Sequence, residues 1–365
     1  MKINRPIEAL IIGDSTHNTL SVVRSLGEAK IGFALILVTD HDFCNVRYSK
    51  YIDNSHLYIV SELKKSDEII QIYEDQNIKI ICTFDAAAMY VDSLEEELCI
   101  HFRTPANGKH IGELFEKEAQ CRLAKQCGLS VPKSQSYNRN NPISDIAIPY
   151  PILLKPAVSV EGEKSDIHIC NNNAELSNAL HSESRCDEFI VQEFIDKEYE
   201  IDCIGVRTEQ GMYMPGGIRK YRHYPELTGA GAYGIFQPME KYNINTQAVE
   251  RFLEAANYYG PFSVEFLHAD DKDYFMEVNF RNEGLAYAAT CAGANLHALC
   301  VRPDYIIKRD KIKSVYMMNY SIDFMYVKDG SITLRHWLRD FFRTRCFINI
   351  NFKDLKPVIR HYINK

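Results

Sequence analysis

The sequence predicts an α/β domain followed by a larger α+β region. Short apolar runs at 8–12, 33–38 and 78–84 are separated by helical segments, a pattern typical of a parallel sheet covered on both faces. From residue 189 onward, strand-like runs follow at short intervals, which favours a mainly antiparallel sheet. The chain of 365 residues is long enough for two or three domains or lobes.

The remaining elements are predicted in chain order. A helical pattern over 111–130 ends at Gly128, and a strand over 150–157 ends at a proline. Helices are expected over 171–182, where asparagines can cap the start, and near 246–259. Five later strands are expected, with the sequences FIVQEFI, YEIDCIGV, MYMPGGIRKYRHY, GPFSVEFLHA and YFMEVNFR. We therefore divide the chain into residues 1–110, 111–190, 191–320 and a C-terminal extension, 321–365.

Composition excludes several classes of protein. The net charge of -7 and the absence of a basic, aromatic pattern argue against nucleic acid as a partner. Eleven scattered cysteines without a C-x-x-C pair are typical of reduced thiols. No apolar run is long enough for a transmembrane helix, and the N-terminus does not fit a signal peptide. We expect a cytoplasmic protein.

Acidic side chains alternate along two adjacent strand candidates. SVEF carries Glu265, and MEVNFR carries Glu277, Asn279 and Arg281 at every second position, so each set shares one strand face. The intervening ADDKD suits a turn, and the resulting hairpin would bring Glu265 close to Glu277 and Asn279. Carboxylate and amide oxygens are hard ligands that suit Mg²⁺ or Mn²⁺. A solvent-facing hairpin carrying surface charges would show the same pattern.

Two lysines and a second acidic segment add to this pattern. Lys155 ends a strand before a polar loop, and Lys117 lies on the preceding helix, where each could meet phosphate oxygens. In VQEFIDKEYEID, the Glu193–Phe194–Ile195 segment could offer backbone groups to a flat heterocycle, and Glu200 could accept hydrogen bonds from sugar hydroxyls. Taken singly, each of these features also fits an ordinary solvated surface.

In order and spacing these segments resemble the ATP-grasp superfamily of carboxylate–amine ligases, including its D-aspartate ligase and carbamoyl-phosphate-synthetase-like members. FEKEAQCRLAKQCGLSVPKS, PILLKPAVSVEGEKSD, VQEFIDKEYEID, SVEF and MEVNFR resemble the family's successive ATP-site motifs, and the likeness covers roughly residues 7–320. It implies a Rossmann-like pre-ATP-grasp domain, a two-lobed ATP-grasp fold, and ATP and Mg²⁺ or Mn²⁺ as cofactors. One departure is the phosphate loop SVEGEKSD, which has a single glycine, Gly162, where the family has more glycine and serine.

The resemblance also implies a role for each motif residue. Lys117 and Lys155 would hold the phosphates of ATP. The adenine would contact Glu193, Phe194 and Ile195, and the ribose would contact Glu200. The metal would be bound by Glu265, Glu277 and Asn279, and the acyl phosphate by Arg281. The implied reaction joins a small-molecule carboxylate, activated as an acyl phosphate, to an amine, with an amino acid expected as one substrate. An ATP-grasp kinase without ligation and a non-catalytic nucleotide-binding protein are the alternatives.

A glycine-rich segment and a basic strand lie between these motifs. GAGAYG at 229–234 fits the dinucleotide fingerprint G-x-G-x-x-G, but no long helix is expected after it, so we interpret it as a flexible loop that closes over the site. In the preceding strand, alternation places Lys220 and Arg222 on one face, where they could hold a substrate carboxylate or phosphate. The K-x-R-H-x-P pattern resembles D-aspartate ligase-type proteins and implies catalytic roles for both, although surface charge on a hairpin fits equally well.

The C-terminal extension is basic and aromatic. From Arg335 to the end, eight Lys and Arg face two Asp, a balance of +6. Such an amphipathic segment either packs its apolar face on the core or lies on an anionic membrane surface, with peripheral contact through 330–365. The tail resembles those of ATP-grasp proteins linked to cell-surface polysaccharide and peptidoglycan precursors, and the family resemblance also implies a homodimer as an expectation to test.

Overall fold

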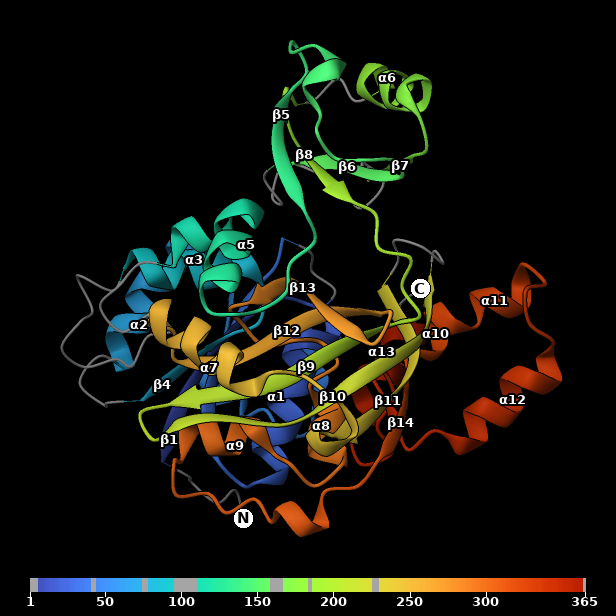
Figure 1. Ribbon diagram of the computed structural model, residues 1–365. Helices are drawn as coiled ribbons and strands as arrows, with labels where there is room; N and C mark the ends of the chain where they lie inside the picture. The colour runs from blue at the N-terminus through green and yellow to red at the C-terminus, as the bar shows by residue number, and fades with distance from the viewer. Residues whose placement is uncertain are drawn as a thin grey trace.

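Three sheets build the protein. We describe its fold from a computed structural model for residues 6–40, 44–73, 78–94, 111–157, 167–182, 186–224 and 230–363. The strand orders are β3-β2-β1-β4, β5-β8-β6-β7 and β13-β12-β9-β10-β11-β14-β15. In Figure 1 the β5–β8 sheet stands above the strands β12 and β13 of the seven-stranded sheet. The predicted combination of α/β and α+β architecture is confirmed.

The N-terminal sheet is parallel throughout and covered on both faces, as predicted. Its strands are β1 (Ile7–Gly13), β2 (Gly32–Val38), β3 (Leu57–Val60) and β4 (Lys79–Cys82), and its helices are α1 (His17–Glu28), α2 (Asp67–Tyr73) and α3 (Asp85–Ser93). Alternate residues of β1 enter two separate cores, Ile11 with α1 and Leu10 with α2 and α3. The edge strand β3 was not predicted, since only Val60 of its four residues is buried.

The second sheet is antiparallel and carries one of the predicted lysines. Its strands are β5 (Ser134–Asn138), β6 (Ile152–Pro156), β7 (His168–Cys170) and β8 (Glu188–Glu193), with α6 (Asn173–Ser182) packed against β7. Helix α5 (Lys117–Gln126) precedes this sheet and ends as predicted at Gly128, whose φ of +89° favours glycine. The loop SVEGEKSD lies outside the described residues.

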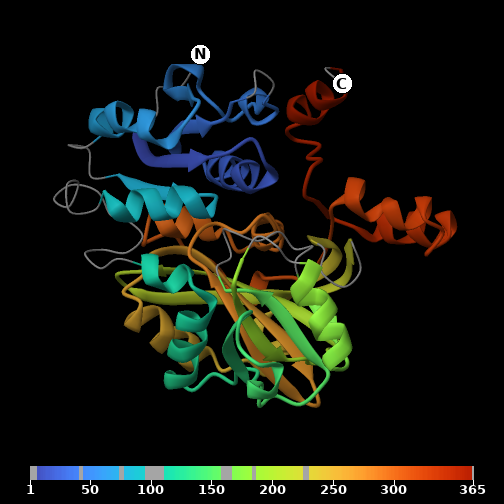
Figure 2. The same ribbon diagram turned by 90° about the horizontal axis from the view of Figure 1, so that it is seen from above.

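The seven-stranded sheet forms the centre of the molecule. Its strands are β9 (Tyr199–Thr208), β10 (Gly211–Tyr224), β11 (Ala230–Pro238), β12 (Gly260–Ala269), β13 (Lys272–Asn279), β14 (Val315–Met318) and β15 (Cys346–Phe347). Helices α5 and α7 (Thr246–Ala255) pack on one face, and α8 (Tyr287–Cys291) and α9 (Leu296–Val301) lie between this sheet and α1. Figure 2 shows α8 and α9 between the N-terminal domain and the central sheet.

The strand β11 corrects the interpretation of GAGAYG. Residues 230–234 lie inside this strand, where Gly234 pairs with Lys220 and Tyr233 pairs with Met318, so they do not form a loop. Only the 3-10 helix Met239–Lys241 follows the strand directly, which agrees with the rejection of a dinucleotide fingerprint. Gly229, and Pro225 of the K-x-R-H-x-P pattern, lie outside the described residues.

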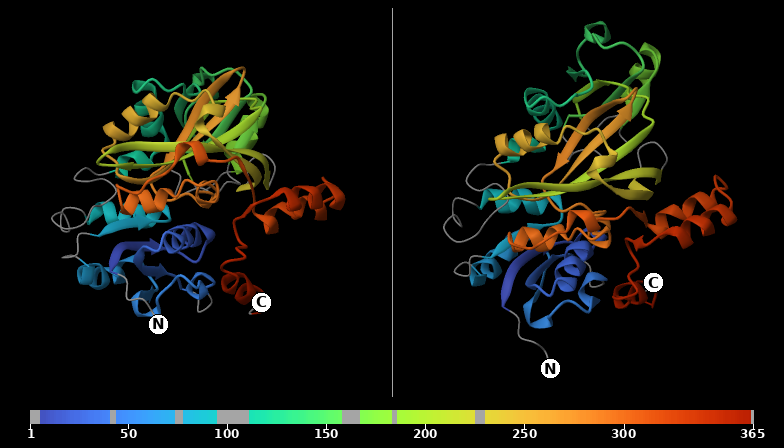
Figure 3. Two further views of the ribbon diagram at one scale, coloured as in Figure 1. Left: turned by 90° about the horizontal axis from the view of Figure 1, so that it is seen from below. Right: turned by 60° about the horizontal axis from the view of Figure 1, so that its bottom comes forward.

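The C-terminal section is built into the fold at both ends. It contains α10 (Tyr320–Asp323), α11 (Met325–Lys328), α12 (Leu334–Arg343) and α13 (Lys356–Ile363), and β15 adds an edge to the central sheet. Trp337 packs edge-on against Phe324, so part of the apolar face of α12 lies on the body. Further on, buried Asp354 pairs with buried Arg24 of α1 at 3.3 Å. In Figure 3, α11 and α12 project from the side of the molecule. The domain limits at residues 110, 190 and 320 stay predictions.

Candidate active site

The predicted hairpin of acids forms in the predicted register. Strands β12 and β13 pair antiparallel, with Glu265 opposite Glu277 and Ser263 opposite Asn279. Asp270 and Asp271 make the turn with φ values of +50° and +57°, a conformation that Asp tolerates better than most residues. The two carboxylates therefore share one face of the sheet.

A third carboxylate continues this line across the sheet. Asp202 of β9 lies directly opposite Glu265, so Glu277, Glu265 and Asp202 form a row over three adjacent strands. Carboxylates directly opposite one another repel, so the row needs a cation. Lys220 supplies one, with its Nζ 2.8 Å from Asp202 Oδ1 and 3.6 Å from Glu265 Oε2.

The ionisation of this row follows from burial and crowding. Burial by itself would lower the pKa of Lys220, but the surrounding carboxylates raise it well above its usual value, so the ammonium keeps its charge. Burial raises the pKa of Glu265, and the charge of Glu277 adds to this while Lys220 opposes it. Burial and Glu265 likewise raise the pKa of Asp202. Full ionisation of the row is thus disfavoured, because Lys220 alone does not offset three buried carboxylates.

These residues offer a place for a divalent cation. Among the described residues, Glu277 makes no side-chain hydrogen bond or ion pair, which leaves its oxygens available. The donors at this point are hard oxygens, which fit Mg²⁺ or Mn²⁺. Asn279 directs its amide nitrogen at Ser263 Oγ (3.2 Å) and Glu265 Oε1 (3.5 Å), so its oxygen would face Glu265 only after rotation of the amide. Within the described part of the chain, no group of three or more His, Cys, Asp and Glu is arranged to hold a metal by itself.

Glu200 lies beside this row and is held in its ionised form. Its Oε2 accepts a hydrogen bond from His223 Nε2 at 2.7 Å and lies 3.5 Å from Lys220 Nζ, while Oε1 is paired with Lys197. Burial would raise the pKa of Glu200, but the hydrogen bond from His223 and the two lysines lower it well below its usual value. An ionised carboxylate here is a strong acceptor of hydrogen bonds.

Arg222 does not share a face with Lys220, which corrects the alternation argument. The β10–β11 register shifts on both sides of Arg222, and this bulge turns its side chain away from the acids. Its guanidinium makes two hydrogen bonds to Asp323, at 2.8 and 2.9 Å, and one to Asp340 at 2.8 Å. Arg222 therefore anchors the C-terminal section, and His223 takes the position beside Lys220.

The two predicted phosphate-binding lysines lie within electrostatic range of each other. Lys155 is buried at the end of β6, and its Nζ donates to Gln192 Oε1 at 2.9 Å. Burial and the charge of Lys117, at the start of α5, lower the pKa of Lys155 to about 8, while Cys121 and Glu277 oppose the shift. Glu277 thus connects this pair of lysines with the row of acids.

The predicted adenine segment leaves one amide available. The Glu193 N–H donates to Lys133 O at 2.8 Å, and the Phe194 N–H donates to Pro151 O at 3.2 Å. Ile195 packs its side chain against Leu267, and its N–H has no partner among the described residues. Of these three residues, Ile195 is the one whose backbone N–H is available to donate a hydrogen bond to a ligand.

Arg281 links the hairpin to the N-terminal domain. Its Nε lies 2.9 Å from Asp85 Oδ1, Nη1 lies 3.1 Å from Glu283 Oε2, and Nη2 lies 3.0 Å from Asn279 Oδ1. Burial alone would lower the pKa of Arg281, but Glu283 and Asp85 raise it above its usual value. Next to it, buried Asn282 donates to Asn18 O at 2.8 Å. The hairpin end is therefore fixed at the carboxyl edge of the parallel sheet.

Sequence reasoning missed Asp202, Glu283 and Asp85 at this site, and the pairing of His223 with Glu200. Asp202 alternates with Glu200 in YEID, and Glu283 follows Arg281 by two positions, so the same alternation would have found both. His223 stood in the basic strand without an assigned partner, and Asp85 follows β4 with no local signal of its contact with Arg281.

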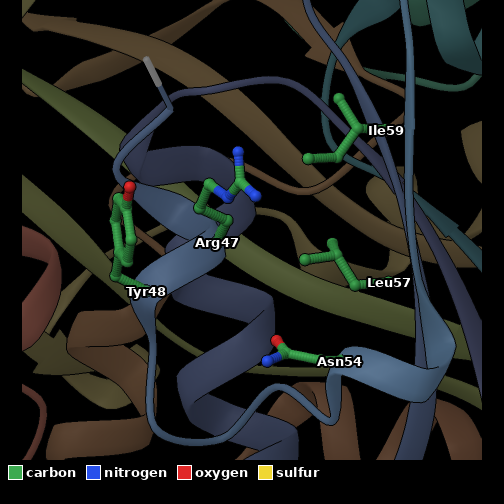
Figure 4. Close-up of a pocket in the computed structure, with 5 residues that line it drawn as sticks. All are labelled: Arg47, Tyr48, Asn54, Leu57 and Ile59. Atoms are coloured by element: carbon green, nitrogen blue, oxygen red, sulfur yellow. The ribbon is translucent and has the colours of Figure 1, made fainter. Parts of the chain in front are cut away.

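A hollow of about 360 Å³ lies elsewhere, on the N-terminal domain. It is lined by Arg47, Tyr48, Asn54, Leu57 and Ile59, which Figure 4 shows around the end of β3. None of these is a predicted site residue, so this hollow is separate from the row of acids.

Comparisons with known proteins agree with the geometry. No protein-family model matches the sequence. The chain is 25% identical over 244 residues to the formate-dependent phosphoribosylglycinamide formyltransferase of a Nitratiruptor species, an alignment that covers 62% of this chain and 59% of that protein. The protein of the same name from a Sulfurovum species is 29% identical over 143 residues, which are 37% of this chain and 35% of that one. The chain thus spans less than two thirds of the length of either relative.

Solved structures share the fold over nearly the whole chain. N5-carboxyaminoimidazole synthetase from Staphylococcus aureus complexed with ADP has a TM-score of 0.65 at 15% identity and covers 90% of this chain and 87% of its own. The L-amino acid ligase from Bacillus licheniformis has a TM-score of 0.59 at 15% identity, with 88% and 77% covered. At these identities the likeness shows a common fold.

Proposed function

The chain has the ATP-grasp fold, and on that premise we propose that it is an ATP- and Mg²⁺-dependent ligase that joins a carboxylate to an amine. The observation that carries the proposal is the row of carboxylates at Glu277, Glu265 and Asp202, with the cation Lys220 inside it. Such crowding of like charge costs folding free energy. A site that binds nucleotide phosphates would explain this cost, because such a site must also hold a divalent cation.

The nucleotide would be held from two sheets. Lys117 and Lys155 supply positive charge for phosphate oxygens, Ile195 supplies a free N–H for the base, and ionised Glu200 accepts from sugar hydroxyls. Glu265, Glu277 and Asn279 would hold the Mg²⁺, which neutralises charge on the phosphates when bound. We keep Lys220 as a catalytic candidate, because its ammonium stays charged at the centre of the site.

The proposed chemistry needs no side-chain nucleophile. A carboxylate oxygen of the substrate attacks the γ-phosphorus of ATP, the bond from that phosphorus to the bridging oxygen breaks, and ADP leaves. An amine then attacks the carbonyl carbon of the acyl phosphate, loses a proton, and inorganic phosphate leaves with the attacking carboxylate oxygen. Positioning and neutralisation of charge are the main requirements of phosphoryl transfer. Arg281 is the candidate for holding the acyl phosphate. Its N–H groups donate to Asp85, Glu283, Asn279 and Asn282 O, so contact with the substrate would exchange one of these hydrogen bonds.

The substrate classes follow from the relatives as hypotheses. Formate is named in the relatives that match in sequence, and amino acids are named for one structural neighbour. We therefore expect a small carboxylate and an amine, with an amino acid as one of them. Amine-bearing precursors of cell-surface polysaccharide or peptidoglycan are further acceptors to test.

Release of ADP across a matrix of carboxylates and amines tests the proposal, with products identified by mass spectrometry. One combination should give ADP, phosphate and a new amide, and Glu277→Gln should abolish all three. Glu254→Gln, at an exposed glutamate of α7, is the matched control and should retain activity. A stable phosphorylated product formed without an amine would show a kinase instead, and ADP release by Glu277→Gln at the wild-type rate would exclude the metal assignment.

A further inference from the structure

Apolar side chains on the surface gather in the C-terminal section. Twelve large apolar side chains are exposed among the described residues, and seven of them lie within the last 32 residues of the chain. They are Leu334, Leu338, Phe342, Phe352, Leu355, Ile359 and Tyr362, which we call the C-terminal apolar surface. Phe342 and Phe352 are 75% and 78% exposed. Leu334, Leu338 and Phe342 share α12, and the other four lie between Phe352 and Tyr362. Exposed apolar side chains gathered on one element of a folded protein mark a contact surface.

The charges around this surface have one sign. From residue 335 onward the only acidic side chains are Asp340 and Asp354, and both are buried and ion-paired. From residue 335 onward, every exposed ionisable side chain of the described residues is therefore basic or a histidine or tyrosine, and the exposed Asp329 lies before α12. The whole chain carries -7 and residues 335–365 carry +6, so the rest carries -13. A basic, apolar surface is attached to an acidic body.

Helix α12 shows how the two properties combine. At about 100° per residue, its apolar side chains form one continuous face that is wider than the body covers. Trp337 and Phe341 pack on the body, whereas Leu334, Leu338 and Phe342 remain exposed on the adjoining strip. Arg335, Arg339 and Arg343 come next around the helix. An exposed apolar strip bordered by arginines is the pattern of a helix that lies in a lipid interface.

The position of the helix leaves this strip accessible. Helices α11 and α12 project from the body, and α13 lies on the same side of the molecule (Figures 2 and 3). The projecting part is fixed at its base by the Arg222–Asp323 and Arg222–Asp340 pairs. None of the described helices is long and apolar enough to cross a bilayer, so the contact would be interfacial.

We propose that the C-terminal apolar surface docks the protein on an anionic lipid bilayer. A twofold dimer through the same surface would place two basic strips against each other, which charge repulsion disfavours. An anionic bilayer supplies both the negative charge and the apolar interior that the surface matches. This contact is independent of the proposed ligase activity, so a result that excludes membrane binding would not exclude the ligase activity, and the reverse also holds.

Co-sedimentation of the full-length protein with vesicles tests the proposal. We expect binding to mixed phosphatidylcholine–phosphatidylglycerol vesicles, little binding to phosphatidylcholine alone, and weakening by salt. The double variant Leu338→Ser, Phe342→Ser should bind at least about tenfold more weakly. Arg335→Gln with Arg339→Gln should weaken binding by roughly fivefold for each charge removed.

Ile306→Ser is the matched control, because Ile306 is 80% exposed but lies outside the C-terminal section. It should bind vesicles like the wild type, and all variants should show the wild-type thermal unfolding midpoint. Equal binding to neutral and anionic vesicles, or wild-type binding by the serine variant, would overturn the proposal. So would a dimer, detected by light scattering, that Phe342→Ser dissociates while vesicles do not bind at all.

Discussion

Replacing Lys155 by methionine should remove activity without a matching loss of stability. Burial places the pKa of Lys155 at about 8, against 10.5 for an unperturbed lysine. This difference of about 2.5 units corresponds to roughly 3 kcal/mol of unfavourable folding free energy at neutral pH. Lys155→Met removes this unfavourable free energy, but it also removes the hydrogen bond to Gln192, which costs about 1–3 kcal/mol. We expect Lys155→Met to keep or raise the free energy of unfolding while ADP release is lost.

The pH dependence distinguishes this effect from better packing by methionine. Because the folded-state pKa lies below the unfolded one, wild-type stability rises with pH between about 8 and 10.5. The advantage of Lys155→Met should therefore shrink by about 2 kcal/mol between pH 7 and pH 9.5. Urea unfolding followed by circular dichroism measures both values, with Lys125→Met at an exposed position of α5 as the control. A variant that is several kcal/mol less stable at pH 7 and follows the wild-type pH dependence would refute the reasoning.

Three further predictions concern the remaining groups. Glu277→Gln should leave the urea midpoint unchanged or slightly higher, since it removes a charge opposite Glu265, and a clear drop would reveal a structural role. Arg222→Gln should cost about 3–5 kcal/mol in urea unfolding, because it leaves the buried carboxylate of Asp323 without its partner and removes one of the cations paired with Asp340. ADP release per folded molecule should nevertheless stay close to the wild-type rate. Lower activity of Arg222→Gln with an intact fold would indicate that Arg222 acts in the active site. Glu200→Gln should raise KM for ATP by about tenfold or more. Because the pKa of Glu200 is lowered, its contribution to stability is present above pH 4.5 and is lost as the pH falls further, so the variant and the wild type should converge in acid.

Local patterns in the sequence predicted the hairpin of acids and most of the strands. Glu265 and Glu277 could be placed opposite each other because alternation and the ADDKD turn fix the register of adjacent strands. Gly128 could be placed at the end of α5 because only a residue that accepts positive φ suits that point. In each case the deciding interaction lies within a few residues or one turn.

The errors come from interactions that are not local. Alternation predicts Arg222 beside Lys220 because it assumes a regular strand, but the bulge that breaks the alternation depends on pairing with β11. The glycines of residues 230–234 favour a loop, but pairing with β10 and β14 makes these residues a strand. The contact of Arg281 with Asp85 joins residues 196 positions apart, which no spacing rule reports.

Transfer of oxygen from the carboxylate to phosphate tests the central claim most directly. With a substrate pair that releases ADP, the carboxylate is labelled with oxygen-18 and the released phosphate is analysed by mass spectrometry. Attack of the carboxylate on ATP predicts one labelled oxygen in each phosphate formed and an amide that retains the other. Phosphate without label, or a stable phosphorylated product in place of the amide, would contradict the account.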